Sequence, residues 1–188
     1  MTIAQTLEPH WFDDNLAIAG ALSRDDMARF VGQGCRMLID LRDGSEAGGA
    51  GLLSTEERAY AGRLGIEYHS IPLSPGGRCE DSIAAVRQLL SRSVGRTVLH
   101  CSDGARAAAM ALIHLGCDQG AMLGECYARA EALRARDCNV EEFMDLWVEY
   151  ILYHPDDRAT AVTRRRQQAG ACPAANPRRP ISWSEPGH

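Results

Sequence analysis

Short apolar runs alternate along the chain with longer segments whose apolar residues recur every three or four positions. The short runs predict strands, and they span residues 16–19, 37–41, 66–71 and 97–99. The periodic segments predict helices over 23–31, 55–64, 83–90, 105–115, 121–135 and 140–153. Strands that alternate with helices are typical of an α/β fold, with a central, mostly parallel sheet flanked by helices. We expect 16–19 to be an edge strand.

Start and stop signals refine these bounds. Ser23 precedes acidic residues and predicts a helix N-cap, Thr55 is expected to cap the next helix, and Asp81 or Ser82 the third. Gly116 is expected to close the alanine-rich helix over 105–115.

The stretch over 97–116 is the most informative part of the chain. An apolar strand leads through a tight segment with Gly104 into the alanine-rich helix. The first N–H groups of a helix have no intrahelical partners and carry positive potential, so this junction predicts an anion site. Cys101 stands at the mouth of that site and Arg106 in the first turn. We therefore expect Cys101 to be a thiolate near neutral pH, with the Arg106 guanidinium facing an oxyanion.

The remaining cysteines do not suggest a metal or disulfide framework. The chain has seven cysteines, at scattered positions and with no C-x-x-C pair, which favours free thiols in a reducing compartment. It has no lysine, so lysine Schiff-base chemistry and a P-loop lysine are excluded. A buried, purely structural cysteine is the competing interpretation of Cys101. Two roles are open to Asp40 and Arg42 at the end of a predicted strand: an approach to the Cys101 pocket, or a surface ion pair, which we expect.

Composition and charge set the broad class. The 188 residues are 45% hydrophobic and 24% charged, as in a globular protein. No apolar run is long enough to cross a membrane and no secretion signal is visible, so the expected location is the cytoplasm. The net charge of −5 argues against a nucleic-acid partner.

The composition changes near residue 156. We expect one folded domain over 1–155 and a flexible, basic, proline- and arginine-rich tail over 156–188. The tail holds six arginines against three acidic residues, which suits contact with an acidic partner or simple solvation.

Three ordered segments carry a family resemblance. The loop His100-Cys101-Ser102-Asp103-Gly104-Ala105-Arg106 resembles the signature of the cysteine-dependent protein tyrosine and dual-specificity phosphatases. It is most similar to the bacterial DUF442 group, found alone or fused to β-lactamase-fold hydrolases. The strand segment 34–42 and the segment 64–72 resemble two further motifs of that group.

The resemblance implies a mechanism without metal or cofactor. Cys101 would attack the phosphorus of a phosphorylated substrate and form a phosphocysteine, and His100 would orient the loop. The leaving oxygen would take a proton from an acid, for which Asp81 is the candidate. The phosphate would be held by the loop itself, through Ser102, Asp103, Gly104, Ala105 and Arg106.

Three departures keep other functions open. Four residues, not five, separate Cys101 from Arg106, Ala107 replaces a hydroxyl residue, and Asp103 brings a carboxylate into the loop. The shorter span is that of rhodanese-like sulfurtransferases, which would carry a persulfide on Cys101. A phosphate-binding module without catalysis is the third hypothesis. The substrate and the oligomeric state are not indicated by the sequence.

Overall fold

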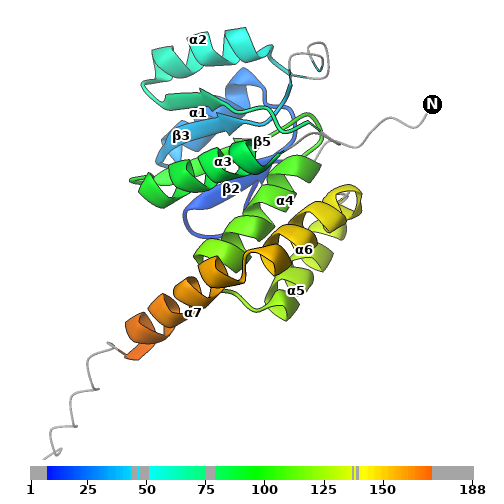
Figure 1. The fold of residues 1–188 in the computed structure, drawn as a ribbon. Helices are drawn as coiled ribbons and strands as arrows, with labels where there is room; N and C mark the ends of the chain where they lie inside the picture. The colour runs from blue at the N-terminus through cyan, green and yellow to red at the C-terminus, as the bar shows by residue number, and fades with distance from the viewer. Residues whose placement is uncertain are drawn as a thin grey trace, which may run out of the picture.

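The computed structural model describes residues 8–43, 46, 51–74, 79–136, 138 and 140–170. Its strands form one sheet in the order β1-β2-β5-β3-β4. All neighbours pair in parallel except β1 with β2. The predicted α/β fold with a mostly parallel sheet is thus confirmed (Figure 1). The strands are β1 (His10–Trp11), β2 (Leu16–Ala19), β3 (Cys35–Asp40), β4 (Glu67–Ser70) and β5 (Arg96–His100).

Helices cover both faces of the sheet. On one face lie α1 (Arg24–Gly32) and α2 (Ser54–Leu64). The helical segments associated with the other face are α3 (Glu80–Arg92), α4 (Ala105–Ile113), the π-helix η2 (His114–Asp118), α5 (Leu123–Arg134), the 3-10 turn η3 (Val140–Phe143), α6 (Met144–Tyr153) and α7 (Pro155–Gly170). No helix among the described residues is long and apolar enough to cross a membrane.

The central strands β3 and β5 carry apolar residues in their middle, Met37 to Ile39 and Val98 to Leu99, because these positions are buried on both sides of the sheet. Successive side chains of a strand point to opposite faces. Leu38 of β3 and Val98 of β5 accordingly pack toward α1 and α2, whereas Ile39 and Leu99 pack toward α3 and α4. Helix α4 runs through the second core with every residue buried, which explains its alanines: small side chains let the sheet and the other helices approach it closely.

Several predicted element ends are corrected by the structure. Ser23 does cap α1, since its hydroxyl accepts a hydrogen bond from the Asp26 N–H. Thr55 is not a cap, because α2 begins one residue earlier and the Leu53 N–H is bound by the Glu56 carboxylate. Neither Asp81 nor Ser82 caps α3, which follows Cys79 directly. Strand β2 is not at an edge, because β1 extends the sheet beyond it.

Gly116 does not end the helix that follows the cysteine loop. The chain continues from α4 into η2, and Gly116 lies inside that π-helical turn. A Cβ at this position would come within 2.6 Å of Ile151 Cδ1 of α6. The residue is therefore a close-packing glycine rather than a stop signal.

The segment from Asp156 to residue 170 is helical. It forms α7, whose Ala161 is buried and whose Asp157 accepts a hydrogen bond from Arg87 of α3 at 2.8 Å. Arg165 pairs with Glu125 of α5 at 3.1 Å. The prediction of a flexible tail is thus wrong for 156–170. Residues 171–188 lie outside the described residues, and the domain division and the acidic partner stay predictions.

Candidate active site

The cysteine loop lies at the carboxyl edge of the parallel strands, where ligand sites of such sheets are found. It joins β5 to α4, the two elements that the sequence analysis placed around it. Gly104 turns the chain with φ of 99°, a left-handed conformation that glycine adopts without strain. Its carbonyl accepts the Ala108 N–H at 2.9 Å and so begins α4.

The sulfur of Cys101 is held at the floor of the loop. The side chain is fully buried, and the Gly104 N–H donates to Sγ at 3.1 Å. Burial raises the pKa of the Cys101 thiol, and the Asp103 carboxylate raises it further. The backbone N–H of Ala107 and the Arg106 guanidinium act in the opposite direction but do not outweigh burial. The expected thiolate is therefore not favoured in this conformation, in which the thiol donates to Asp103 Oδ1 at 3.3 Å.

Asp103 points into the loop. Its Oδ1 accepts the Ala105 N–H at 3.0 Å, a donor that the resemblance assigns to phosphate. The Asp103 carboxylate thus already accepts a backbone hydrogen bond that a phosphate in the predicted anion site would need. A phosphate that uses this donor must first move the Asp103 side chain aside.

Arg106 is anchored by a residue that the sequence analysis missed. Its Nη1 and Nη2 both donate to the Glu46 carboxylate, and Nη2 also donates to Ser102 Oγ at 2.9 Å. The carbonyls of Leu41 and Leu73 accept from Nη1 at 3.4 and 3.3 Å. Burial acts to lower the pKa of Arg106, but the bonds with Glu46 and the other neighbouring groups together raise that pKa.

The anchoring carboxylate is itself held in place. The Ser102 hydroxyl donates to Glu46 Oε2 at 2.6 Å. Burial acts to raise the pKa of Glu46, but its bonds with Arg106 and Ser102 lower it. No motif marks Glu46, which lies in a glycine-rich stretch and reaches Arg106 only through the fold.

The predicted general acid is not part of this constellation. Asp81 lies exposed in the first turn of α3. Within the described ranges, no hydrogen bond or ion pair joins it to the cysteine loop. The structure therefore gives no support to Asp81 as the acid, and that role stays a prediction.

Behind the loop lies a buried cluster of charged side chains. Asp40 is fully buried, and both of its oxygens accept from Arg42 at 2.9 Å, so the expected surface pair is an interior one. His100, also fully buried, places Nε2 3.2 Å from Glu57 Oε2 and 3.7 Å from Asp40 Oδ1. Burial acts to raise the pKa of Asp40, but the hydrogen bonds from Arg42 and Ser54 and the nearby His100 together hold that pKa well below its usual range.

The same cluster meets the distance criterion for a metal site but fits an ion poorly. Ligand atoms of Asp40, Glu57 and His100 lie within 4.8 Å of one another. The Asp40 oxygens, however, already accept from Arg42, from Ser54 Oγ at 2.6 Å and from Tyr68 Oη at 2.8 Å. Arg42 also lies 2.7 Å from Glu57, so a cation already neutralises both carboxylates.

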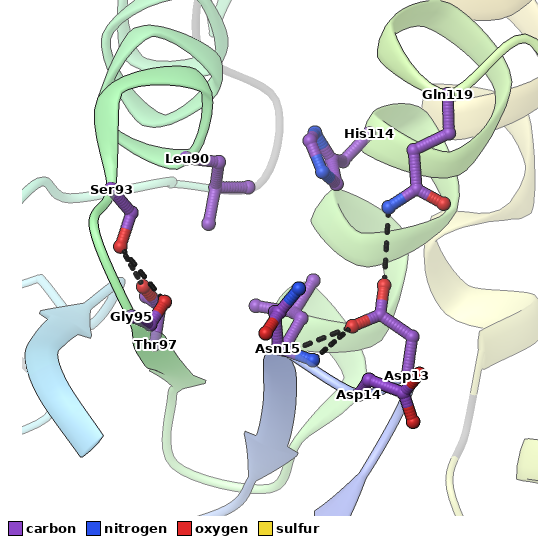
Figure 2. Close-up of a pocket in the computed structure, with 10 residues that line it drawn as sticks. Asp13, Asp14, Asn15, Leu90, Ser93, Gly95, Thr97, His114 and Gln119 are labelled. Carbon is purple, nitrogen blue, oxygen red and sulfur yellow. Dashed lines mark hydrogen bonds between the residues drawn. The ribbon is translucent and has the colours of Figure 1, made fainter. Parts of the chain in front are cut away.

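A polar cavity of about 330 Å³ lies at the amino ends of the parallel strands, beside the first residues of β2 and β5 and away from the Cys101 loop (Figure 2). Its polar groups largely bind one another. Asp13 Oδ1 accepts the N–H groups of Asn15 and Leu16, and Asp13 Oδ2 accepts from Gln119 at 3.1 Å. Ser93 and Thr97 share a hydrogen bond of 2.8 Å. No cysteine lines this cavity, and it is separate from the Cys101 site.

A cysteine at the end of a central parallel strand, a tight loop and an arginine in the next helix define a class: the phosphatase-like α/β proteins. Residues 10–135 match the family described as the phosphatase-like domain of beta-lactamase hydrolase-like protein, and the chain belongs to that family. The resemblance stated from the three sequence segments is thereby confirmed.

Individual relatives agree with this assignment. Beta-lactamase hydrolase-like proteins of Agrobacterium fabrum and Xylella fastidiosa are 34% and 32% identical over 96 residues, half of this chain. The match covers only 22% of the length of those relatives. A candidate phosphatase of Neisseria meningitidis superposes with a TM-score of 0.61 at 18% identity, over 74% of this chain and 96% of that one. TpbA of P. aeruginosa gives 0.59 at 15% identity, over 85% and 98%. At these sequence identities, the two structures support the assignment of the fold and nothing beyond it.

Proposed function

We propose that this domain hydrolyses phosphomonoesters through a phosphocysteine on Cys101. The observation that carries the proposal is the placement of a sulfur and a guanidinium at one helix N-terminus. The Gly104 N–H points at Sγ, and Arg106 stands in the first turn of α4. Such a loop can stabilise charge on a phosphoryl group without a metal.

The reaction begins with loss of the thiol proton to solvent. Cys101 Sγ then attacks phosphorus, forming the S–P bond as the ester P–O bond breaks, and the leaving oxygen takes a proton. Water next cleaves the S–P bond and releases inorganic phosphate and the thiol. Arg106 and the loop N–H groups would hold the phosphoryl oxygens once Asp103 has turned outward.

The substrates we expect to react most readily are those whose leaving group needs the least help from an acid. Without proton donation, the leaving group must be stable as an anion, which favours aryl over alkyl phosphates. The test is hydrolysis of p-nitrophenyl phosphate, with acid-quench mass spectrometry to detect phosphocysteine. Cys101→Ser should abolish turnover, and Cys79→Ser is the matched control. Unchanged turnover in Cys101→Ser contradicts the proposal.

Sulfur transfer is a second candidate because four residues separate Cys101 from Arg106. Its step would move a sulfane sulfur from thiosulfate to Cys101, releasing sulfite, and then from the persulfide to cyanide, releasing thiocyanate and the thiolate. Thiocyanate formation without phosphoester turnover would favour this candidate. Binding of phosphate with neither activity would identify a binding module.

A further inference from the structure

Glu57 of α2 is a buried carboxylate without an assigned role. It is fully buried, and its Oε2 lies 2.7 Å from Arg42 Nη2 and 3.2 Å from His100 Nε2. Neither of its oxygens, and neither ring nitrogen of His100, has a partner with hydrogen-bond geometry among the described residues. Burying a charge is costly unless other charges compensate it, and Arg42 is the permanent cation beside Glu57.

The charges of the cluster point to a proton on His100. Facing its ring are Glu57 from α2 and Asp40 from β3, and Arg42 pairs with both of these carboxylates. Tyr68 of β4 and Ser54 of α2 reach the same cluster as donors to Asp40. Two carboxylates thus face one guanidinium. A His100 ring that carries protons at both nitrogens makes this buried set neutral.

The cluster lies directly behind the reactive loop. His100 precedes Cys101, and its carbonyl accepts the Leu41 N–H at 2.9 Å. The Leu41 carbonyl in turn accepts from Arg106 Nη1 at 3.4 Å. Glu57 therefore contacts the ends of β3 and β5 through Arg42 and His100. The end of β5 leads into Cys101, and the residue after β3, Leu41, accepts a hydrogen bond from Arg106.

We propose that Glu57 is a positioning residue for the Cys101 loop, acting through a His100 imidazolium that it keeps charged and oriented toward α2. The proposal rests on the proposed function in taking Cys101 as the reactive group. It adds a residue from α2, a helix that contributes nothing to the loop itself. Removing the Glu57 charge would release the ring proton, and the loss of that positive charge beside the loop disfavours the thiolate.

The direction in which the Cys101 thiol pKa shifts when the Glu57 charge is removed distinguishes action through His100 from direct action on the sulfur. A carboxylate acting on the sulfur only through space disfavours the thiolate, so its removal would lower the thiol pKa. Acting through His100, its removal raises that pKa. The measurement is the pH dependence of Cys101 alkylation by iodoacetamide, followed by peptide mass spectrometry. We expect Glu57→Gln to move the midpoint upward and to slow alkylation at pH 7 about threefold to tenfold.

Glu56→Gln is the matched control, since it removes the same charge from an exposed position of the same helix, and it should leave the midpoint unchanged. In a His100→Asn background, Glu57→Gln should no longer raise the midpoint. A midpoint that falls or stays in Glu57→Gln, or that still rises in that background, overturns the proposal.

A measurement on the unsubstituted protein tests the proposal even if the Glu57 variant does not fold. NMR shifts of the His100 ring nitrogens at pH 7 should show protons on both, and a neutral ring overturns the proposal. Neither experiment requires turnover. Failure of the proposed function would instead appear as absent phosphocysteine while the alkylation midpoints behave as expected.

Discussion

The Asp103 carboxylate provides the sharpest test of how the loop controls its sulfur. It lies 3.3 Å from Cys101 Sγ and is one cause of the raised pKa of that thiol. Asp103→Asn removes the charge but keeps an oxygen that can accept the Ala105 N–H. The substitution should therefore lower the thiol pKa with little change in the loop.

The separation of the two groups sets the size of the effect. Two unit charges 3.3 Å apart interact by about 1.3 kcal/mol in a water-like dielectric and by about 5 kcal/mol at an effective constant near 20. One pKa unit corresponds to about 1.4 kcal/mol. Because Asp103 is partly exposed and its charge is offset by the Ala105 N–H, we expect the lower end of this range. The thiol pKa should fall by about one unit, which makes the thiolate about tenfold more abundant at neutral pH.

The assay is the pH dependence of iodoacetamide alkylation at Cys101, read by peptide mass spectrometry because other cysteines are present. Asp25→Asn, at an exposed position of α1, controls for the change in net charge. Tungstate binding should also tighten in Asp103→Asn, since the carboxylate no longer competes for the loop. An unchanged or higher alkylation midpoint would refute the assigned role of Asp103.

Three further outcomes are expected. Glu46→Gln should lower kcat/KM for p-nitrophenyl phosphate about tenfold, because Arg106 loses a charge-assisted anchor worth about 1.5–3 kcal/mol. Glu131→Gln, in a surface ion pair, is its control, and a gain of activity would instead make Glu46 a competitor of phosphate. Gly120→Ala should destabilise the fold by about 1–3 kcal/mol, since a Cβ there meets the Val162 backbone at 2.6 Å in a left-handed conformation. Gly124→Ala, with open space around it, should not destabilise, and equal melting temperatures for the two variants would contradict the docking of α7. The Asp40 pKa lies below its ordinary value of 3.8, so the unfolded state takes up the proton first and stability falls as pH drops below about 4. Urea unfolding between pH 7 and 3 should show this slope, up to about 1.4 kcal/mol per pH unit, reduced in Asp40→Asn; an equal slope in both proteins would contradict it.

The order of strands and helices was predictable because it depends on local patterns. Apolar runs such as 97–99 and the alanine-rich helix after them reveal burial without any knowledge of partners. The Cys101 and Arg106 pair was equally visible, since a strand, a tight loop and a helix are consecutive in the chain. Helix caps were predicted less well, because several residues near the start of each helix can act as the N-cap and tertiary packing selects among them.

The contacts that define the site were decided only by the tertiary structure. Glu46 binds Arg106 across 60 positions of sequence, and Glu57 reaches His100 from a different helix. Neither carboxylate differs, in the sequence, from an exposed one. The sequence determined by itself that a cysteine and an arginine would meet at a helix N-terminus. Whether the sulfur there is thiol or thiolate depends on burial and on neighbouring charges, which exist only once the chain is folded.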